Sequence, residues 1–101
     1  MNSQRPNGSS RTTLFPIGAL IFSAGVDRLM REYRLDPMPY FQRHARADWG
    51  DVSDEKWRAN NTALQSGGRL ESFYRVHREL SICIFTEADR SATHVVLASE
   101  R

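Results

Sequence analysis

The spacing of apolar residues changes near Arg69 from a helical period to a strand period. Before this point apolar residues recur three or four positions apart, which is typical of helices that bury one face. After it, residues 70–76 alternate between two faces, residues 80–85 are almost continuously apolar, and residues 93–98 are rich in β-branched side chains. The connections between these runs are short enough for antiparallel hairpins. The sequence therefore predicts an α+β domain that ends in a three-stranded antiparallel β-meander.

The region before Arg69 predicts a short N-terminal strand followed by three helices. Residues 17–22 are apolar and β-rich, and Ser23 after them is a favourable N-cap for the first helix. The buried face of this helix is expected to carry four residues at helical spacing, Val26, Leu29, Met30 and Tyr33.

The second and third helices have their own start and stop signals. Asp36 and Pro37 suit the cap and first position of a short helix that ends near Ala45 and buries Phe41 with Tyr40 or Met38. Ser53 can cap the third helix, and Gly67 and Gly68 end it. Asn60 and Asn61 lie near the buried stripe of that helix, where an unsatisfied amide costs roughly 1–3 kcal/mol. We therefore expect one of them to tether a neighbouring loop, with residues 48–51 as the candidate.

The length and composition fit a single domain. With 101 residues, of which 40% are hydrophobic, the chain can bury one modest core. Residues 1–13 are polar, so we expect a disordered arm before a single α+β domain at residues 14–101. The formal charge is +2, and Lys56 is the only lysine. Arginine therefore supplies almost all of the positive charge, which suits ion-paired surfaces as well as nucleic acid.

Cys83 is the only cysteine, so no intrachain disulfide is possible and a reducing, cytoplasmic location fits best. Its apolar neighbours favour a small core residue over a nucleophile. Arg5 and Arg11 before the apolar stretch 14–26 also resemble a secretory signal peptide, although Pro16 and Gly18 interrupt that stretch. The stretch is shorter than the roughly 20 apolar residues that span a membrane, and we expect no membrane partner.

His44, Asp48 and Asp51 are candidates for a metal site or an acid–base pair. A histidine and two carboxylates suit a divalent ion, and a metal-dependent enzyme built on them is the third functional hypothesis. Their spacing crosses a predicted helix end and a glycine turn, which matches no standard ligand pattern. The sequence therefore favours turn and cap hydrogen bonds for the two aspartates, with Trp49 folded onto the core. We predict no metal ligand and no catalytic residue.

Glu87, Asp89 and Arg90 are predicted at the tip of a hairpin, where rigid strands present side chains outward. Together with Asp48 and Asp51 they are the candidate partner-binding residues. The alternative is a structural turn in which Asp89 hydrogen-bonds its own backbone and Arg90 pairs with Glu87. Such an exposed pair is worth roughly 0–1 kcal/mol.

Arginines on the first two helices define an alternative, nucleic-acid-binding surface. If these helices pack side by side, their arginines would cluster and contact phosphates, with Arg5 and Arg11 of the arm beside them. Phosphate-driven binding of this kind weakens steeply with salt. The helix residues are Arg28, Arg31, Arg34, Arg43 and Arg46.

Several blocks of sequence carry a resemblance to a known family. They are RHARADWGD at 43–51, Ala59-Asn60, Ala63-Leu64, GRL at 68–70 and TEADRS at 86–91. Over residues 17–97 the chain resembles small uncharacterised proteins of proteobacterial plasmids, integrated elements and prophages. The resemblance implies no activity or cofactor, but it implies a mobile-element setting in which small proteins often block host defence machinery. This chain has Ala47 where the family has glycine, which we expect to stiffen the corner.

These observations predict a non-enzymatic binding protein without a cofactor. The leading hypothesis is inhibition of a host nucleic-acid-targeting defence complex by occlusion, in the manner of anti-CRISPR or anti-restriction proteins. The acidic side chains would occupy arginine or lysine sites that normally hold phosphate. The partner would be a host protein or ribonucleoprotein complex, and the oligomeric state is left open. The alternative is a small nucleic-acid-binding accessory protein of a plasmid or prophage.

Overall fold

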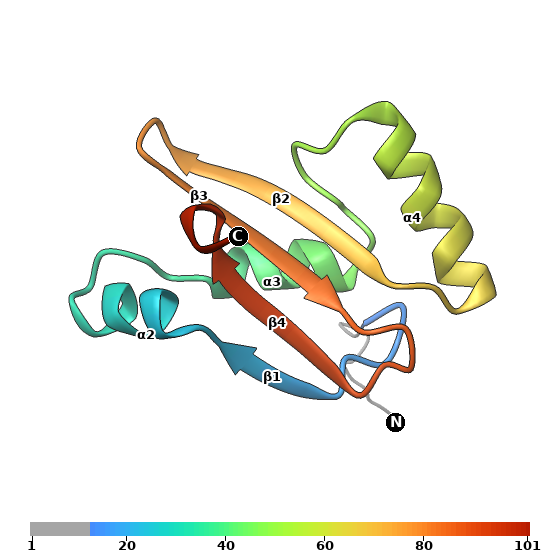
Figure 1. The fold of residues 1–101 in the computed structure, drawn as a ribbon, viewed down its shortest axis with the longest axis horizontal. Coiled ribbons are helices and arrows are strands. Elements are labelled where there is room, and N and C mark those ends of the chain that lie inside the picture. The colour runs from blue at the N-terminus through green and yellow to red at the C-terminus, as the bar shows by residue number, and fades with distance from the viewer. Residues whose placement is uncertain (1–12) are drawn as a thin grey trace, which may run out of the picture.

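The structure is a computed structural model that describes residues 13–101, so the arm expected at residues 1–13 lies almost wholly outside the described residues. The four strands form one sheet in the order β1-β4-β3-β2 (Figure 1). The elements run β1 (Ala19–Phe22), α2 (Ala24–Arg31), α3 (Met38–Ala45), α4 (Asp54–Ser66), β2 (Leu70–His77), β3 (Leu80–Thr86), β4 (Ala92–Leu97) and the 3-10 turn η2 (Ala98–Glu100). The prediction of an α+β fold is confirmed.

The sheet is mixed and has four strands, which corrects the expected three-stranded antiparallel meander. β2, β3 and β4 are antiparallel neighbours in chain order, but β1 pairs in parallel with β4, from Ala19 opposite Ala92 to Phe22 opposite Val95. A strand of four residues is too short to reveal its partner, and the long connection between β1 and β4 permits parallel pairing without dictating it. The stretch 14–26, also considered as a signal peptide, contributes β1 and the start of α2.

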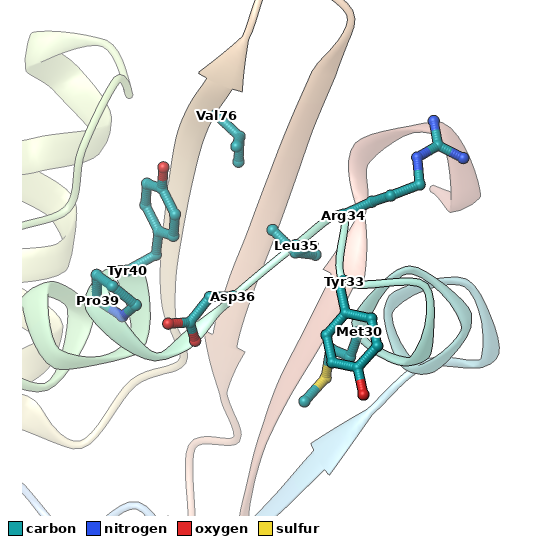
Figure 2. A pocket seen from close by; sticks show the side chains of 8 residues that line it. All are labelled: Met30, Tyr33, Arg34, Leu35, Asp36, Pro39, Tyr40 and Val76. Atoms are coloured by element: carbon teal, nitrogen blue, oxygen red, sulfur yellow. The ribbon is translucent and has the colours of Figure 1, made fainter.

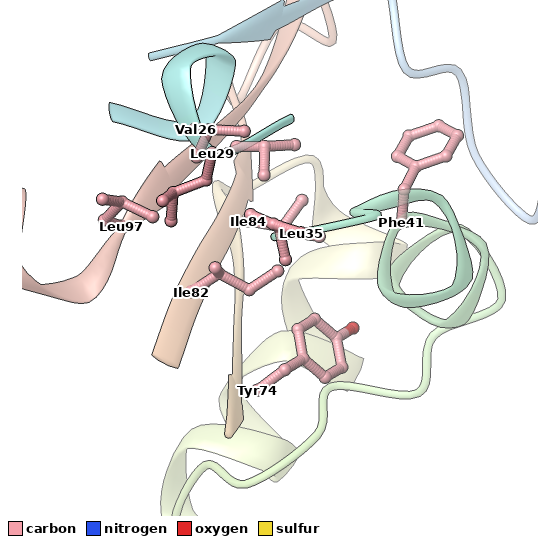
Figure 3. Close-up of a cluster of buried hydrophobic side chains, with 9 residues drawn as sticks. Val26, Leu29, Leu35, Phe41, Tyr74, Ile82, Ile84 and Leu97 are labelled. Carbon is pink, nitrogen blue, oxygen red and sulfur yellow. The ribbon is translucent and has the colours of Figure 1, made fainter. Parts of the chain in front are cut away.

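The main core lies between one face of the sheet and the helices α2 and α3. Figure 1 shows α3 crossing behind the sheet, and Figure 3 shows side chains of α2, β2, β3 and β4 gathered there, with Phe41 of α3 at the margin of the cluster. Fully burying a large apolar side chain contributes about 1.5–3 kcal/mol, so this cluster is the main source of stability. Its buried members are Val26, Leu29, Leu35, Phe41, Tyr74, Ile82, Ile84, Val95 and Leu97.

Helix α2 begins as predicted but ends earlier. The Ser23 hydroxyl accepts a hydrogen bond from the Val26 N–H at 3.1 Å, which confirms the cap. Val26 and Leu29 are buried and Met30 is half-buried. Tyr33, expected on the same face, is 96% exposed. The helix ends at Arg31, and a left-handed backbone at Tyr33 (φ 57°) turns its side chain away from the core.

Helix α4 follows its predicted signals, whereas α3 begins at Met38 with Pro37, instead of Asp36, as its N-cap. The Asp36 carboxylate accepts a hydrogen bond from the Met38 N–H, and Phe41 is buried while Met38 is exposed. The Ser53 hydroxyl accepts one from the Lys56 N–H, and Gly67, at φ 90°, ends α4. Helix α4 lies beside β2, which is an edge strand of the sheet (Figure 1). A second, smaller core lies there, built on Phe15, Trp49 and Leu70.

Candidate functional site

The corner at residues 48–51 forms a cover for the open edge of β2. The backbone of Phe73 accepts a hydrogen bond from the Asp51 N–H at 2.6 Å and donates one to the Trp49 carbonyl at 3.1 Å. The Asp51 carboxylate accepts the next outward N–H of the strand, that of Arg75, at 3.0 Å. At Gly50, φ is 79° and an added Cβ would collide with the Phe73 carbonyl, so glycine is required. Asp51 therefore hydrogen-bonds backbone groups of an edge strand that would otherwise be free to pair with another chain and promote aggregation.

Asp48 is held within the same corner. Its carboxylate accepts hydrogen bonds from both Nε and Nη2 of Arg43, at 2.8 and 3.3 Å, and one from the Gly50 N–H. The Arg43 guanidinium holds the pKa of Asp48 below its usual range. The Asp48 carbonyl accepts a hydrogen bond from the Tyr74 hydroxyl at 2.6 Å. The predicted turn hydrogen bond is thus present for Asp48, whereas Asp51 bonds the edge of β2 instead of a turn or a helix cap.

Both asparagines of α4 anchor the β2 edge. Trp49 is fully buried, and its indole N–H donates to the side-chain oxygen of Asn61 at 3.0 Å, which confirms the expected tether to the corner. Asn60 donates to the Glu71 carbonyl at 2.7 Å and accepts from the Glu71 N–H at 3.1 Å. The Asn60 amide thus replaces a missing strand neighbour at Glu71, a position that the corner does not reach.

His44 is fully buried against the sheet and belongs to a chain of hydroxyl groups. Its Nδ1 lies 2.6 Å from the Ser72 hydroxyl, and its Nε2 lies 2.9 Å from the Thr86 hydroxyl. The Thr86 hydroxyl lies 2.8 Å from that of Thr93, which donates to the Ile17 carbonyl. Both ring nitrogens of His44 are therefore occupied within the fold.

The direction of this chain fixes the tautomer of His44. Because the proton of Thr93 goes to the Ile17 carbonyl, the Thr86 hydroxyl must donate to Thr93. Thr86 has no second proton, so Nε2 of His44 carries the hydrogen that bonds to it, and Nδ1 accepts the hydrogen of Ser72. Every hydroxyl proton in the chain has an acceptor only while the imidazole is neutral.

The buried site disfavours the charged form of His44. Burial, with a smaller contribution from the charge of Arg90, lowers the pKa of His44 to about 4. The ring also meets Phe15 and Trp49 edge-on, with centroids 5.5 Å away in each case. Within residues 13–101, the His44 ring and the carboxylates of Asp48 and Asp51 do not converge, and no group of three potential ligands is placed to hold a metal ion.

Arg90, predicted to face a partner, instead points inward from the turn between β3 and β4. Its guanidinium donates to the carbonyl oxygens of Gly68 and Ala63 at the end of α4, at 2.6 and 3.2 Å, and lies over the Phe15 ring. A cation suits the negative end of a helix. Arg90 also donates to the backbone carbonyl of Glu87 at 3.2 Å, whereas the Glu87 carboxylate pairs with His94 at 3.0 Å. The expected ion pair between Arg90 and Glu87 is therefore replaced by a backbone contact.

The same turn presents acidic side chains outward. Asp89 is exposed, and its carboxylate accepts the Ser91 N–H at 2.9 Å, as predicted for a turn residue. Hydrogen bonds from Ser91 lower the pKa of Asp89, so it stays ionised at neutral pH. The Glu87 side chain is 41% exposed. An open hollow of about 430 Å³ lies between them, lined by Glu87, Ala88, Asp89, Ser91 and Ala92.

The structure does not gather the arginines of α2 and α3 into one surface. Helix α2 packs on β4 and β1, whereas Arg43 lies over the Tyr74 ring of β2 at the other end of the sheet. All five candidates are exposed, but three of them already face acids. The pairs are Arg31 with Asp27, Arg34 with Glu32, and Arg43 with Asp48.

Sequence reasoning missed the hydroxyl partners of His44. Ser72 shares the buried face of β2 with Leu70 and Tyr74, and Thr86 and Thr93 lie in β3 and β4. A serine in an apolar alternation signals a buried polar partner, because a lone buried hydroxyl is costly. That partner is the histidine on α3, and only the packing of α3 on the sheet reveals it.

Comparisons with known protein families, curated proteins and solved structures give no match for this chain. In residues 13–101, none of the helices is both long enough and apolar enough to span a membrane.

Proposed function

We propose that this protein acts by binding, and that it inhibits a nucleic-acid-targeting defence complex of its host by occluding a phosphate-binding surface. The observation that carries the proposal is the charge separation at the β3–β4 turn. Arg90 is turned inward to α4, while Glu87 and Asp89 face solvent. The turn therefore presents its two acidic side chains to solvent, while its one basic side chain is held within the fold.

The turn is also held rigidly, which favours binding. Arg90 ties it to the end of α4, and Asp89 closes it through the Ser91 N–H. Less conformational entropy is lost on association when a binding loop is already ordered. A partner would therefore meet two carboxylates in fixed positions.

The partner that this surface fits is a protein with exposed arginine or lysine side chains. The hollow beside Asp89 admits a basic side chain, and charge-assisted hydrogen bonds between guanidinium and carboxylate are among the strongest available. Sites that bind phosphate in nucleic-acid-targeting complexes present such side chains. The family resemblance, with its mobile-element setting, supports a host defence complex as the target.

Binding rather than catalysis is favoured by how the other candidate groups are used. His44 is enclosed by hydroxyl partners, Asp48 pairs with Arg43, and Asp51 bonds the backbone of β2. Each of these groups holds the fold together.

A protection assay in cells tests the proposal. A plasmid or phage targeted by the host defence complex should survive when the protein is expressed, and Asp89→Lys with Glu87→Gln should abolish that survival. Glu79→Lys is the matched control, since Glu79 is an exposed acid in the other hairpin turn of the sheet. No protection by the wild-type protein, or equal protection by the turn variant, would contradict the proposal. Direct, salt-dependent binding of nucleic acid by the free protein would favour the accessory-protein alternative instead.

A further inference from the structure

Tyr33 occupies a backbone conformation that tyrosine disfavours, at a position where the fold gains little from its side chain. It follows the C-cap of α2 with φ 57°, and its N–H and that of Arg34 bond back to the carbonyls of Met30 and Leu29. Glycine or asparagine is usual at this point of a helix end. The Tyr33 side chain is 96% exposed. Unfavourable backbone conformations of this kind cluster where a residue serves a function.

Tyr33 lines one end of an open groove that has both polar and apolar walls. The groove measures about 510 Å³ and is formed by the end of α2, the linker to α3, the start of α3 and β2. Figure 2 shows Tyr33 and Arg34 at one end of the groove, Pro39 and Tyr40 at the other, and Leu35 between them. Exposed aromatic and apolar side chains beside a groove are typical of protein interfaces.

The charges around the groove are of both signs. Arg34 is exposed, and its contact with Glu32 is a surface pair of 3.3 Å that solvent readily replaces. Asp36 is exposed near the centre of the groove, with one oxygen bonded to the Met38 N–H. A projecting ring beside a groove, with a cation and an anion two residues apart, allows this surface to pair with a second copy across a twofold axis.

We infer that this surface joins two copies of the chain in a twofold dimer. In such an interface each residue contact occurs twice, so Tyr33 of each copy enters the groove of the other, and Arg34 of each copy faces Asp36 of the other. The dimer leaves the acidic β3–β4 turns free, because that turn and the end of α2 lie at opposite ends of the molecule (Figure 1). The inference is independent of the proposed function.

Sedimentation equilibrium of the full chain over a concentration series tests the dimer. The wild-type protein should show a reversible monomer–dimer equilibrium. Tyr33→Gly should raise the dissociation constant of the dimer by about tenfold or more, because the projecting ring is lost. It should also raise the thermal unfolding midpoint of the monomer, since glycine adopts a positive φ without strain. Tyr33→Phe should retain the dimer. A monomeric wild-type protein, or a dimer that Tyr33→Gly leaves intact, would overturn the inference.

A charge exchange adds a test that a purely structural role would not pass. Arg34→Asp alone and Asp36→Arg alone should each weaken the dimer, because each places like charges opposite one another twice. A mixture of the two variants should form a heterodimer in which both pairs are attractive again. Arg58→Asp, at an exposed position of α4 that does not line the groove, is the control and should leave the dimer unchanged. Failure of the mixture to associate better than either variant alone would contradict the arrangement.

Discussion

The guanidinium of Arg90 donates a hydrogen bond to the carbonyl oxygen of Gly68 at 2.6 Å. This contact joins the hairpin between β3 and β4 to the loop that leads from α4 into β2, the edge strand of the sheet. It explains why a turn with one basic and two acidic residues presents an acidic surface, since the basic residue serves the fold.

Replacing Arg90 with glutamine should destabilise the protein by about 2 kcal/mol, because carbonyl oxygens at the end of α4 lose a charged donor. Arg90→Lys should recover only part of this loss, since an ammonium group lacks the planar fork that reaches both carbonyls. Urea denaturation of the two variants and the wild type measures the difference. Equal stability of all three proteins would show that the clamp contributes nothing.

Stability should fall as the pH drops from 7 to 5, because of His44. A histidine pKa lowered to about 4 in the folded state, against an ordinary value of 6.5, means that the unfolded chain binds the proton first. The stabilisation is complete above pH 6.5 and is lost as the pH falls toward 4. The expected loss between pH 7 and pH 5 is about 2 kcal/mol.

The His44→Gln variant isolates this effect. It should be less stable at pH 7, because glutamine fits the pair of hydroxyl partners less well, but its stability should be nearly constant from pH 7 to pH 5. His77→Gln, at an exposed position of β2, is the control and should retain the wild-type slope. Urea unfolding at several pH values gives the comparison, and an unchanged slope in His44→Gln would refute the assignment.

Ala47→Gly should stabilise the protein by about 1 kcal/mol. Ala47 adopts φ 65° after α3, a conformation in which a Cβ is unfavourable and glycine is not. The alanine at this corner therefore costs stability, whatever rigidity it adds. Ala59→Gly, inside α4, provides a control of opposite sign with a cost of about 1 kcal/mol. Thermal unfolding of both variants measures the two changes, and a destabilising Ala47→Gly would show that the corner relaxes differently.

Asn60→Ala should be more damaging than Asn61→Ala. Asn60 is buried and satisfies both backbone groups of Glu71, so its loss leaves a donor and an acceptor unpaired at the β2 edge, at a cost of about 2–3 kcal/mol. Asn61 is exposed, and water can replace its contact with Trp49. Denaturation curves and light scattering would show lower stability and more aggregation for the Asn60 variant. The reverse order would exclude Asn60 as the protector of that edge.

The order of the helices and strands could be predicted from the sequence, because the residues that start, end or pattern each element lie within it or next to it. Ser23 and Ser53 cap helices, Gly67 ends one, and the alternation from Leu70 marks β2. The parallel pairing of β1 with β4 could not be predicted, because a strand of four residues carries no information about a partner more than 70 residues away. Tyr33 was misplaced because apolar spacing continued beyond the residue at which the backbone leaves the helix.

The candidate site was predicted less well, because the role of each residue depends on where its side chain points in the folded chain. Asp89 behaves as its turn chemistry indicated, but the sequence could not show that Arg90 would face inward, since that depends on where α4 ends in space. His44 was weighed as a ligand beside the aspartates near it in sequence. Its hydrogen-bond partners are Ser72 on β2 and Thr86 on β3, and Thr86 in turn contacts Thr93 on β4. These hydroxyls lie across the packed interface of α3 and the sheet.

We propose that Glu87 and Asp89 occupy a phosphate-binding surface of a host complex. The most direct measurement is capture of that complex from a lysate of the source organism by the immobilised full chain, followed by elution with a competing oligonucleotide. We predict that the wild-type protein and Glu79→Lys retain the complex and release it to the oligonucleotide, and that Glu87→Gln with Asp89→Lys retains none. Retention by the turn variant, or binding that the oligonucleotide does not displace, would contradict the account.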